Sequence, residues 1–242
     1  MTAYHGGKYR TGPLIASAIV KHTDPEHRVY IEPFCGMCSV LVPIVRHGYF
    51  THHYASDTNL SVIKMWQGVA GGTWKPPAEC TREQFLRLKN DKESTADKGF
   101  IGHHFSYGGA YFASYTNRPV VNVSKRILST AGVICDKVTY ECKDYQAATA
   151  DVSGATIYCD PPYDLCYVNY YDDNRTKVPY DAAAFWSRIY TLARSNSVFV
   201  SEYSVPDYIK EIAVPIISFG VPDSYHKGIS GCDTLWHIKH DI

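Results

Sequence analysis

An acidic residue followed by two prolines and an aromatic residue could carry chemistry at the end of a predicted strand. The apolar run 155–159 is followed by Asp160, Pro161, Pro162 and Tyr163. An exocyclic amino group on an aromatic base is a poor nucleophile, because its lone pair is delocalised into the ring. The Asp160 carboxylate and the Pro161 carbonyl could accept its two N–H bonds, since consecutive prolines fix φ and remove donors. Tyr163 offers a flat face for the base. We predict these four residues as catalytic, with an ordinary Pro-Pro turn as the alternative.

A glycine-containing loop forms a second candidate site. The predicted strand 28–34 carries Glu32 and Phe34 and runs into Gly36, and a helical pattern begins near Ser39. Glycine lets the backbone approach a ligand closely, and the N–H groups of a helix start point toward it. The loop therefore predicts cofactor binding, although a tight strand-to-helix turn would look the same.

An acidic residue follows the next predicted strand. Asp57 comes 21 residues after Gly36, close to the ~20-residue spacing of nucleotide-binding folds, where such a carboxylate accepts from ribose hydroxyls. The alternative is that Asp57 is the N-cap of the helix that begins near Leu60. Near the N-terminus, the segment from Tyr4 to Lys8 contains a Gly pair before the lysine and could bind a carboxylate. A flexible terminus is the competing interpretation of this segment.

Two further segments interleave aromatic and cationic residues, a pattern that suits stacking on bases combined with phosphate contact. The segment 164–180 and the segment 103–118 supply the predicted nucleic-acid contacts, which are Tyr107, Arg118, Tyr167, Tyr170, Tyr171, Arg175 and Lys177. A solvated tyrosine-rich loop is the alternative for the first segment. A packed aromatic core or a cofactor pocket is the alternative for the second.

These candidate residues need a sheet to position them. Apolar runs typical of strands lie at 28–34, 54–58, 138–142, 155–159, 196–201, 214–219 and 234–239, the last two as a hairpin. Helical patterns lie at 10–22, 39–47, 60–69 and 181–194, with Asp181 as an N-cap. Alternation of this kind predicts an α/β fold with a mostly parallel sheet and ligands beyond the carboxyl ends of its strands.

One interval is too long for a single crossover helix. Residues 70–135 contain Gly and Pro pairs, a helical segment near 82–90 and a run rich in Gly, His and aromatic residues. We predict that 70–135 is a small inserted lobe and that 1–69 and 136–242 form the main domain.

Composition narrows the class of protein. The chain has 242 residues, 45% hydrophobic and 20% charged, with a formal net charge of zero, as in an ordinary globular domain. Zero net charge counts mildly against nucleic-acid binding. No apolar run reaches the ~18 residues of a spanning helix, and the first residues resemble no secretion signal. The eight cysteines are expected to be reduced thiols in an intracellular compartment, and Cys35 and Cys38 lack the second pair that a zinc site needs.

Taken together, these motifs resemble those of the Dam-like, alpha-group D12 class of DNA N6-adenine methyltransferases, of the type found in phages and large DNA viruses. The resemblance runs from Tyr4 to about residue 205, with the motifs in the order of the family. An aromatic-x-Gly-Gly-Lys start, a Glu-Pro-Phe-x-Gly loop, a ribose-binding acid and an Asp-Pro-Pro-Tyr turn are all present. Residues 100–112 also look like a segment of the viral members. The sequence departs from the family at Cys38, where a second glycine is usual, and at Tyr4, where tryptophan is usual.

The resemblance implies a Rossmann-like methyltransferase fold that uses S-adenosylmethionine, needs no metal, and methylates a flipped adenine in DNA. By resemblance the cofactor contacts are Tyr4, Lys8, Glu32, Phe34, Gly36, Asp57, Asp144, Tyr145 and Asp160. DNA is the expected partner, a membrane is not, and a homodimer is one option. The alternatives are methylation of RNA adenine or of a protein glutamine amide, and a non-catalytic nucleic-acid-binding relative.

Overall fold

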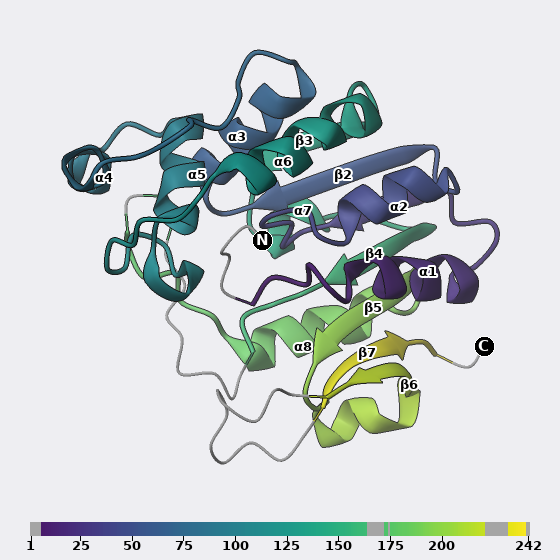
Figure 1. Cartoon of the computed structure of the whole chain (residues 1–242). Helices are drawn as coiled ribbons and strands as arrows, with labels where there is room; N and C mark the ends of the chain where they lie inside the picture. The colour runs from purple at the N-terminus through teal and green to yellow at the C-terminus, as the bar shows by residue number, and fades with distance from the viewer. Residues whose placement is uncertain (1–5, 164–171, 174, 221–231, 241–242) are drawn as a thin grey trace.

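The computed structural model describes residues 6–163, 172–173, 175–220 and 232–240. Within these ranges the strands are β1 Val29–Glu32, β2 His52–Asp57, β3 Val138–Cys142, β4 Ala155–Cys159, β5 Ser197–Glu202, β6 Ala213–Phe219 and β7 Asp233–Ile238. They form one sheet in the order β3-β2-β1-β4-β5-β7-β6 (Figure 1). The five strands from β3 to β5 are parallel, and β7 is antiparallel to both β5 and β6. The predicted α/β class with an antiparallel C-terminal pair is confirmed.

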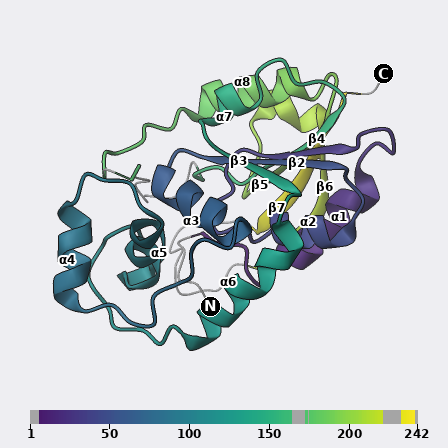
Figure 2. The same ribbon diagram turned by 90° about the horizontal axis from the view of Figure 1, so that it is seen from above.

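Helices cover both faces of this sheet. The helices are α1 Gly12–His22, α2 Leu41–His47, α3 Leu60–Ala70, α4 Arg82–Asn90, α5 Ala96–His104, α6 Val121–Ile134, α7 Tyr145–Ala148 and α8 Ala182–Leu192, with 3-10 turns η1 Tyr107–Gly109 and η2 Asp207–Ile212. Figure 2 shows α1, α2, α3 and α6 on one side of the strands and α7 and α8 on the other. Side chains that alternate along the strands supply both layers. In β1, Tyr30 joins the core under α1 to α3, whereas Ile31 joins the core under α8.

The structure identifies the N-cap residues of α8 and α3. Asp181 precedes α8 and accepts a hydrogen bond from the Ala184 amide at 2.9 Å, so the predicted N-cap is confirmed. Helix α3 is capped by Asn59, whose side chain accepts from the Val62 amide at 3.1 Å. The alternative that Asp57 caps this helix is therefore wrong, because Asn59 is the residue with the required extended backbone.

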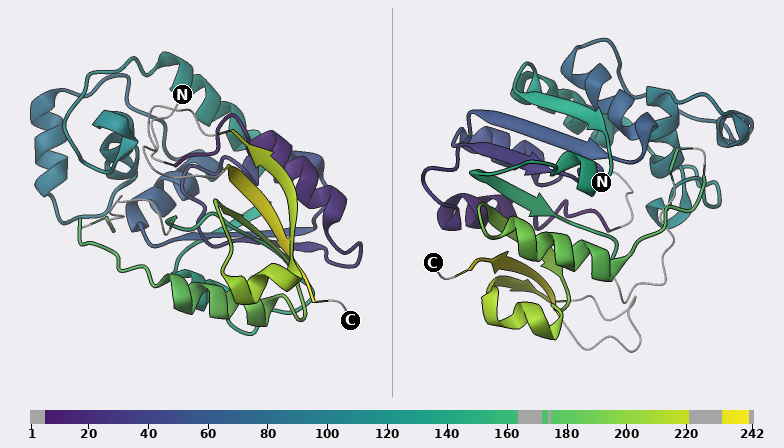
Figure 3. Two further views of the ribbon diagram at one scale, coloured as in Figure 1. Left: turned by 90° about the horizontal axis from the view of Figure 1, so that it is seen from below. Right: turned by 180° about the vertical axis from the view of Figure 1, so that it is seen from behind.

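The interval 70–135 contains α4, α5, η1 and α6. Helix α6 packs with α2 and α3 over the sheet, whereas α4 and α5 extend beyond it, away from β6 and β7 (Figure 3). Helix α5 lies directly against α3. A Cβ atom at Gly99 of α5 would clash with the backbone carbonyl of Ser61, so only glycine permits this approach. Buried residues of the interval, including Phe85 and Phe100, belong to the same hydrophobic cluster as Tyr30 of the sheet. Whether it is a separate domain stays a prediction.

None of the helices in the described ranges has the length and apolar character needed to span a bilayer.

Candidate active site

The carboxyl ends of the parallel strands bring three acidic residues to one edge of the sheet. Glu32 ends β1, Asp57 ends β2, and Asp160 follows β4. Strands β1 and β4 are neighbours, yet the chain continues outward from them in opposite directions. Such a switch point opens a crevice at the carboxyl edge, where ligands of open α/β sheets bind. The predicted cofactor loop and the predicted catalytic turn thus lie on either side of this switch point.

Lys8 forms the centre of a hydrogen-bonded network at the predicted catalytic turn. Its Nζ atom donates to Asp160 Oδ1 at 2.8 Å and to the Tyr163 hydroxyl at 2.6 Å, and it lies 3.5 Å from Asp233 Oδ2. The Tyr163 hydroxyl in turn donates to Asp233 Oδ1 at 2.8 Å. Lys8 is 8% exposed, and the two aspartates are 20% and 22% exposed. Lys8 is therefore placed at the catalytic turn, next to the side chain of Asp160.

Burial and neighbouring charges shift the proton affinities of this network. Burial raises the pKa of Asp160, while the Lys8 ammonium lowers it and the Asp233 carboxylate raises it. Burial tends to lower the pKa of Lys8, but Asp160 and Asp233 leave it raised overall. Burial also raises the pKa of Glu32 to about 8, although the Tyr30 hydroxyl donates to its carboxylate at 2.6 Å. Two carboxylates thus hold Lys8 in its charged form.

In the loop after β1, the backbone amide and the backbone carbonyl of Gly36 both form hydrogen bonds with side chains. Its amide donates to Asp57 Oδ2 at 3.0 Å, and its carbonyl accepts from Trp66 Nε1 at 2.9 Å. The other Asp57 oxygen accepts from the Asn59 amide at 2.9 Å. Burial raises the pKa of Asp57 while these amides lower it. In the free protein, Asp57 therefore ties the loop after β1 to the end of β2.

Cys38 stands where the family has a second glycine, and its backbone is in the left-handed region with φ of 53°. Glycine adopts this conformation at no steric cost, whereas a side chain does so with strain. The Cys38 side chain is 1% exposed. The departure in sequence thus keeps the backbone shape of a glycine and adds a buried thiol.

An aromatic group flanks the same edge. The Phe34 ring stacks on Tyr145 with centroids 5.6 Å apart and an angle of 22°, and it meets Phe185 of α8 edge-on. Asp144, predicted to contact the cofactor, is the N-cap of α7 and accepts from the Ala147 amide at 2.8 Å. Phe34 and Tyr145 are brought together, and Asp144 is exposed beside them.

The predicted nucleic-acid contacts are spread over two regions. Tyr107 is 72% exposed in η1, Arg118 is half-buried, and Arg175 and Lys177 are exposed. Near Arg175, the Asp173 carboxylate accepts from the Ser94 hydroxyl, and the Asp173 carbonyl accepts from the Tyr111 hydroxyl at 3.5 Å. The chain after the catalytic turn thus contacts the interval 70–135. Tyr4, Tyr167, Tyr170 and Tyr171 lie outside the described residues.

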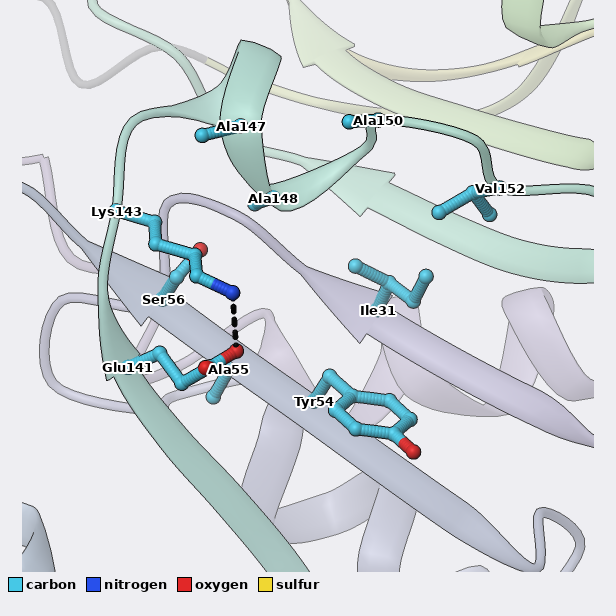
Figure 4. Close-up of a pocket in the computed structure, with 10 residues that line it drawn as sticks. All are labelled: Ile31, Tyr54, Ala55, Ser56, Glu141, Lys143, Ala147, Ala148, Ala150 and Val152. Atoms are coloured by element: carbon cyan, nitrogen blue, oxygen red, sulfur yellow. Dashed lines mark hydrogen bonds and ion pairs between the residues drawn. The ribbon is translucent and has the colours of Figure 1, made fainter.

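A pocket of about 230 Å³ lies elsewhere, on the face of β1 to β3 beneath α7 (Figure 4). Ile31, Tyr54 and Ser56 line it from the sheet, and the ion pair of Lys143 with Glu141 crosses its mouth at 2.8 Å. None of the residues lining this pocket is a predicted site residue.

Sequence reasoning missed two residues that the structure places in the site. Asp233 begins an antiparallel strand, and nothing in its local sequence marks it. Trp66 lies on α3 at helical spacing, where an apolar core role is the ordinary interpretation, yet its indole N–H holds the Gly36 carbonyl.

Comparison with known proteins gives a family match over part of the sequence and similarities to solved structures. Residues 4–107 match the family described as D12 class N6 adenine-specific DNA methyltransferase, so the predicted resemblance is confirmed over that range. No curated protein matches the sequence. Among solved structures, a SAM-dependent O-methyltransferase from Thermotoga maritima is similar with a TM-score of 0.40 and 10% identity, over 95% of this chain and 66% of that one. The chain thus spans just under two thirds of the length of that structure.

Proposed function

We propose that this chain, which carries the D12 class N6 adenine-specific DNA methyltransferase sequence over residues 4–107, methylates the N6 atom of an adenine that has left the DNA stack. S-adenosylmethionine is the cofactor of the class, and it supplies an electrophilic methyl group on a sulfonium. The observation that carries the proposal is the rigid turn Asp160–Tyr163 at the switch point, with Lys8 bound to Asp160 at 2.8 Å.

The residues at the sheet edge suit this cofactor. A sulfonium and an ammonium favour carboxylates, and the acidic residues Glu32 and Asp57 end the two strands beside Gly36. Glu32 has a raised pKa in the free protein, and a bound positive charge would favour its ionised form. The amide and carbonyl of Gly36 are held by Asp57 and Trp66, so the loop is shaped before a ligand arrives. The stacked rings of Phe34 and Tyr145 offer an aromatic surface for a purine. On this donor set we assign Lys8, Glu32, Phe34, Gly36, Asp57, Asp144, Tyr145 and Asp160 to the cofactor side, as the sequence predicted.

Asp160 and Pro161 act on the substrate amino group. The Asp160 carboxylate and the Pro161 carbonyl accept from the two N–H bonds, which localises the lone pair on N6. Bound S-adenosylmethionine would supply the methyl group to this lone pair and keep the C–S electrons on sulfur, and N6 would then lose one proton to water. The Pro161 and Pro162 rings keep the turn rigid, and holding both reactants in line supplies much of the acceleration.

The adenine must leave the helix in this proposal, because the Asp160 side chain is only 20% exposed and a stacked base could not reach it. Flipping costs a few kcal/mol. Tyr163 is half-buried beside Asp160 and presents a ring to the extruded base. Tyr107, Arg118, Arg175 and Lys177 contact the DNA around the target in this proposal.

Transfer of a tritiated methyl group to unmethylated duplex DNA tests the proposal, with N6-methyl-2'-deoxyadenosine identified among the digested nucleosides. Single-stranded RNA and a glutamine-containing peptide serve as the other acceptors. Label in N6-methyladenine of DNA, absent with Asp160→Ala, supports the function. Label only in RNA or in peptide would move the assignment to those substrates, and no transfer to any acceptor by folded protein would leave a non-catalytic relative.

A further inference from the structure

An antiparallel strand brings a second carboxylate to the catalytic turn. Strand β7 runs against β5, with Thr234 opposite Glu202, so β7 begins at the edge where the parallel strands end. Its first residue is Asp233, which pairs with Phe219 of β6. Asp233 therefore lies at the same edge of the sheet as Asp160, on a strand beyond β5. It comes 73 positions after Asp160 in the sequence.

Asp233 contacts the same two groups that contact Asp160. Its Oδ1 accepts from the Tyr163 hydroxyl at 2.8 Å, and its Oδ2 lies 3.5 Å from Lys8 Nζ. The Lys8 ammonium also lies 4.7 Å from the centre of the Tyr163 ring. Tyr203 meets that ring edge-on at 4.9 Å. Lys8 and Tyr203 already contact the Tyr163 ring. The hydrogen bond from Tyr163 to Asp233 therefore has a role other than packing the ring.

The charges explain what Asp233 adds. Lys8 and Asp160 alone form a neutral pair, whereas Lys8 with Asp160 and Asp233 carries a net charge of minus one. Positive charge develops on N6 as the N–C bond forms, and in a partly buried site an uncompensated carboxylate stabilises such charge strongly. A lysine shared between two carboxylates also holds each one less tightly.

We propose that Asp233 is a positioning residue that binds the Lys8 ammonium and the Tyr163 hydroxyl, so that Lys8 is shared between two carboxylates and a net negative charge remains beside the substrate amino group. This inference rests on the proposed function, because it concerns the methylation of that amino group. Asp233 acts through Lys8 and Tyr163 and need not touch the substrate.

The first measurement is steady-state methylation of duplex DNA by Asp233→Asn. The amide keeps the size of the side chain and removes its charge. We expect kcat to fall by about 10- to 100-fold, the scale of a misplaced reacting group, while the KM values for DNA and cofactor stay within about threefold, as for an interaction made in the transition state. Asp233→Glu, which restores the charge, should recover part of the rate. Asp207→Asn is the control, because Asp207 is 95% exposed and pairs only with Lys210 in the described structure.

The second measurement repeats the substitution in a Lys8→Met background. If Asp233 acts through Lys8, the added Asp233→Asn change should cost less than threefold in kcat there, a clear failure of additivity. An unchanged kcat for Asp233→Asn, or an equal loss in both backgrounds, would overturn the inference while leaving the proposed function intact. A wild-type chain that methylates no adenine would remove the proposed function and this inference with it. If Asp233→Asn does not fold, Tyr163→Phe, which deletes only the hydroxyl between the two aspartates, should show the same loss of kcat.

Discussion

The Nζ atom of Lys8 lies 2.8 Å from Oδ1 of Asp160, although 152 positions separate the two residues. This contact requires the segment before α1 to lie near the carboxyl end of β4, where Asp160 follows the strand. The Lys8 ammonium also lowers the pKa of Asp160, in opposition to burial, which raises it. Lys8 thus links the N-terminal motif to the catalytic turn.

Replacing Lys8 should change the pH dependence of the reaction. Lys8 lowers the pKa of Asp160, so Lys8→Met leaves burial and the Asp233 charge to raise it further. Since the reaction needs the carboxylate, the acid limb of kcat/KM should move to higher pH, while activity at high pH recovers in part. A pH–rate profile measures this shift. As a control, Lys210→Met at the exposed pair with Asp207 should leave the profile in place. A lower rate with no movement of the acid limb would mean that Lys8 does not set the charge of Asp160.

Replacing Asp160 should abolish methyl transfer with little effect on the fold. Asp160→Asn keeps one acceptor but removes the charge, and Asp160→Ala removes both. We expect a loss of about 10³-fold or more for alanine, comparable with the removal of a key electrostatic group, and a smaller loss for asparagine. Single-turnover kinetics and thermal melting give the two readouts together. Near wild-type transfer by folded Asp160→Ala would remove Asp160 from the catalytic centre.

Asp57 should matter to cofactor affinity through its charge. Asp57→Asn keeps an acceptor for the Gly36 amide but weakens any charged hydrogen bond to ribose, which contributes about 1.5–3 kcal/mol. Calorimetry should show the corresponding drop in affinity for S-adenosylmethionine. A deoxyribose analogue of the cofactor should bind wild type and variant alike. If the variant instead loses stability and keeps its affinity, Asp57 serves only to tie the loop after β1.

Each predicted apolar run overlaps an observed strand. The pattern is clearest for β4 and β5, because a parallel strand buried along its whole length is a short, nearly continuous apolar run. In the interval 70–135, the predicted helical segment near 82–90 is confirmed as α4, whereas α5 and α6 were not predicted. Helix α5 contains Gly99 and Gly102 and two histidines, which mask a helical pattern, although the glycines are what let it pack on α3 and against Tyr111. Helix α6 is rich in β-branched residues, yet Val123, Ile127, Thr130 and Ile134 are its buried stripe, and their spacing could have revealed it.

Candidate site residues could be predicted from the sequence where they belong to a contiguous motif. They could not be predicted where only the tertiary structure brings them to the site. Asp160 to Tyr163 and the Gly36 loop each carry a local signature. Asp233 carries none, because its place beside Lys8 follows from the antiparallel entry of β7 into the sheet, a property of topology. The N-cap alternative for Asp57 failed for a local reason, since Asn59 stands two residues nearer the helix start.

Glu32 should make stability depend on pH. Its folded pKa of about 8 lies above the ordinary glutamate value of 4.5, so the folded state binds the proton more tightly than the unfolded state. Its contribution to stability is then fully present below pH 4.5 and is lost as pH rises to about 8. Glu32→Gln, whose amide still accepts from Tyr30, removes this dependence.

Urea unfolding of both proteins at several pH values measures the effect. The free energy of unfolding of the variant should rise relative to that of the wild type as pH increases through that window. The buried histidines His103 and His237, with pKa values of about 4, act equally in both proteins and cancel in the difference. A constant difference across the window would mean that Glu32 is ionised in the folded protein.

Two glycine-to-alanine changes should have opposite effects and so test the packing of the interval 70–135. Gly99 lies in α5 against the carbonyl of Ser61 in α3, and an added Cβ clashes with backbone that cannot rotate away. Gly99→Ala should therefore force α5 from α3 and cost about 1–3 kcal/mol, the usual cost of overpacking. Gly132 lies in α6 with no atom within 4 Å of an added Cβ, so Gly132→Ala should stabilise the protein by about 0.5–1 kcal/mol through helix propensity.

Chemical denaturation followed by both tryptophan fluorescence and circular dichroism measures the two effects. Because Phe85 and Phe100 share one hydrophobic cluster with the sheet, both probes should report a single transition in each variant. Two separate transitions in Gly99→Ala would show instead that the interval unfolds as a unit of its own, and a neutral effect of that change would contradict the close approach of α5 to α3.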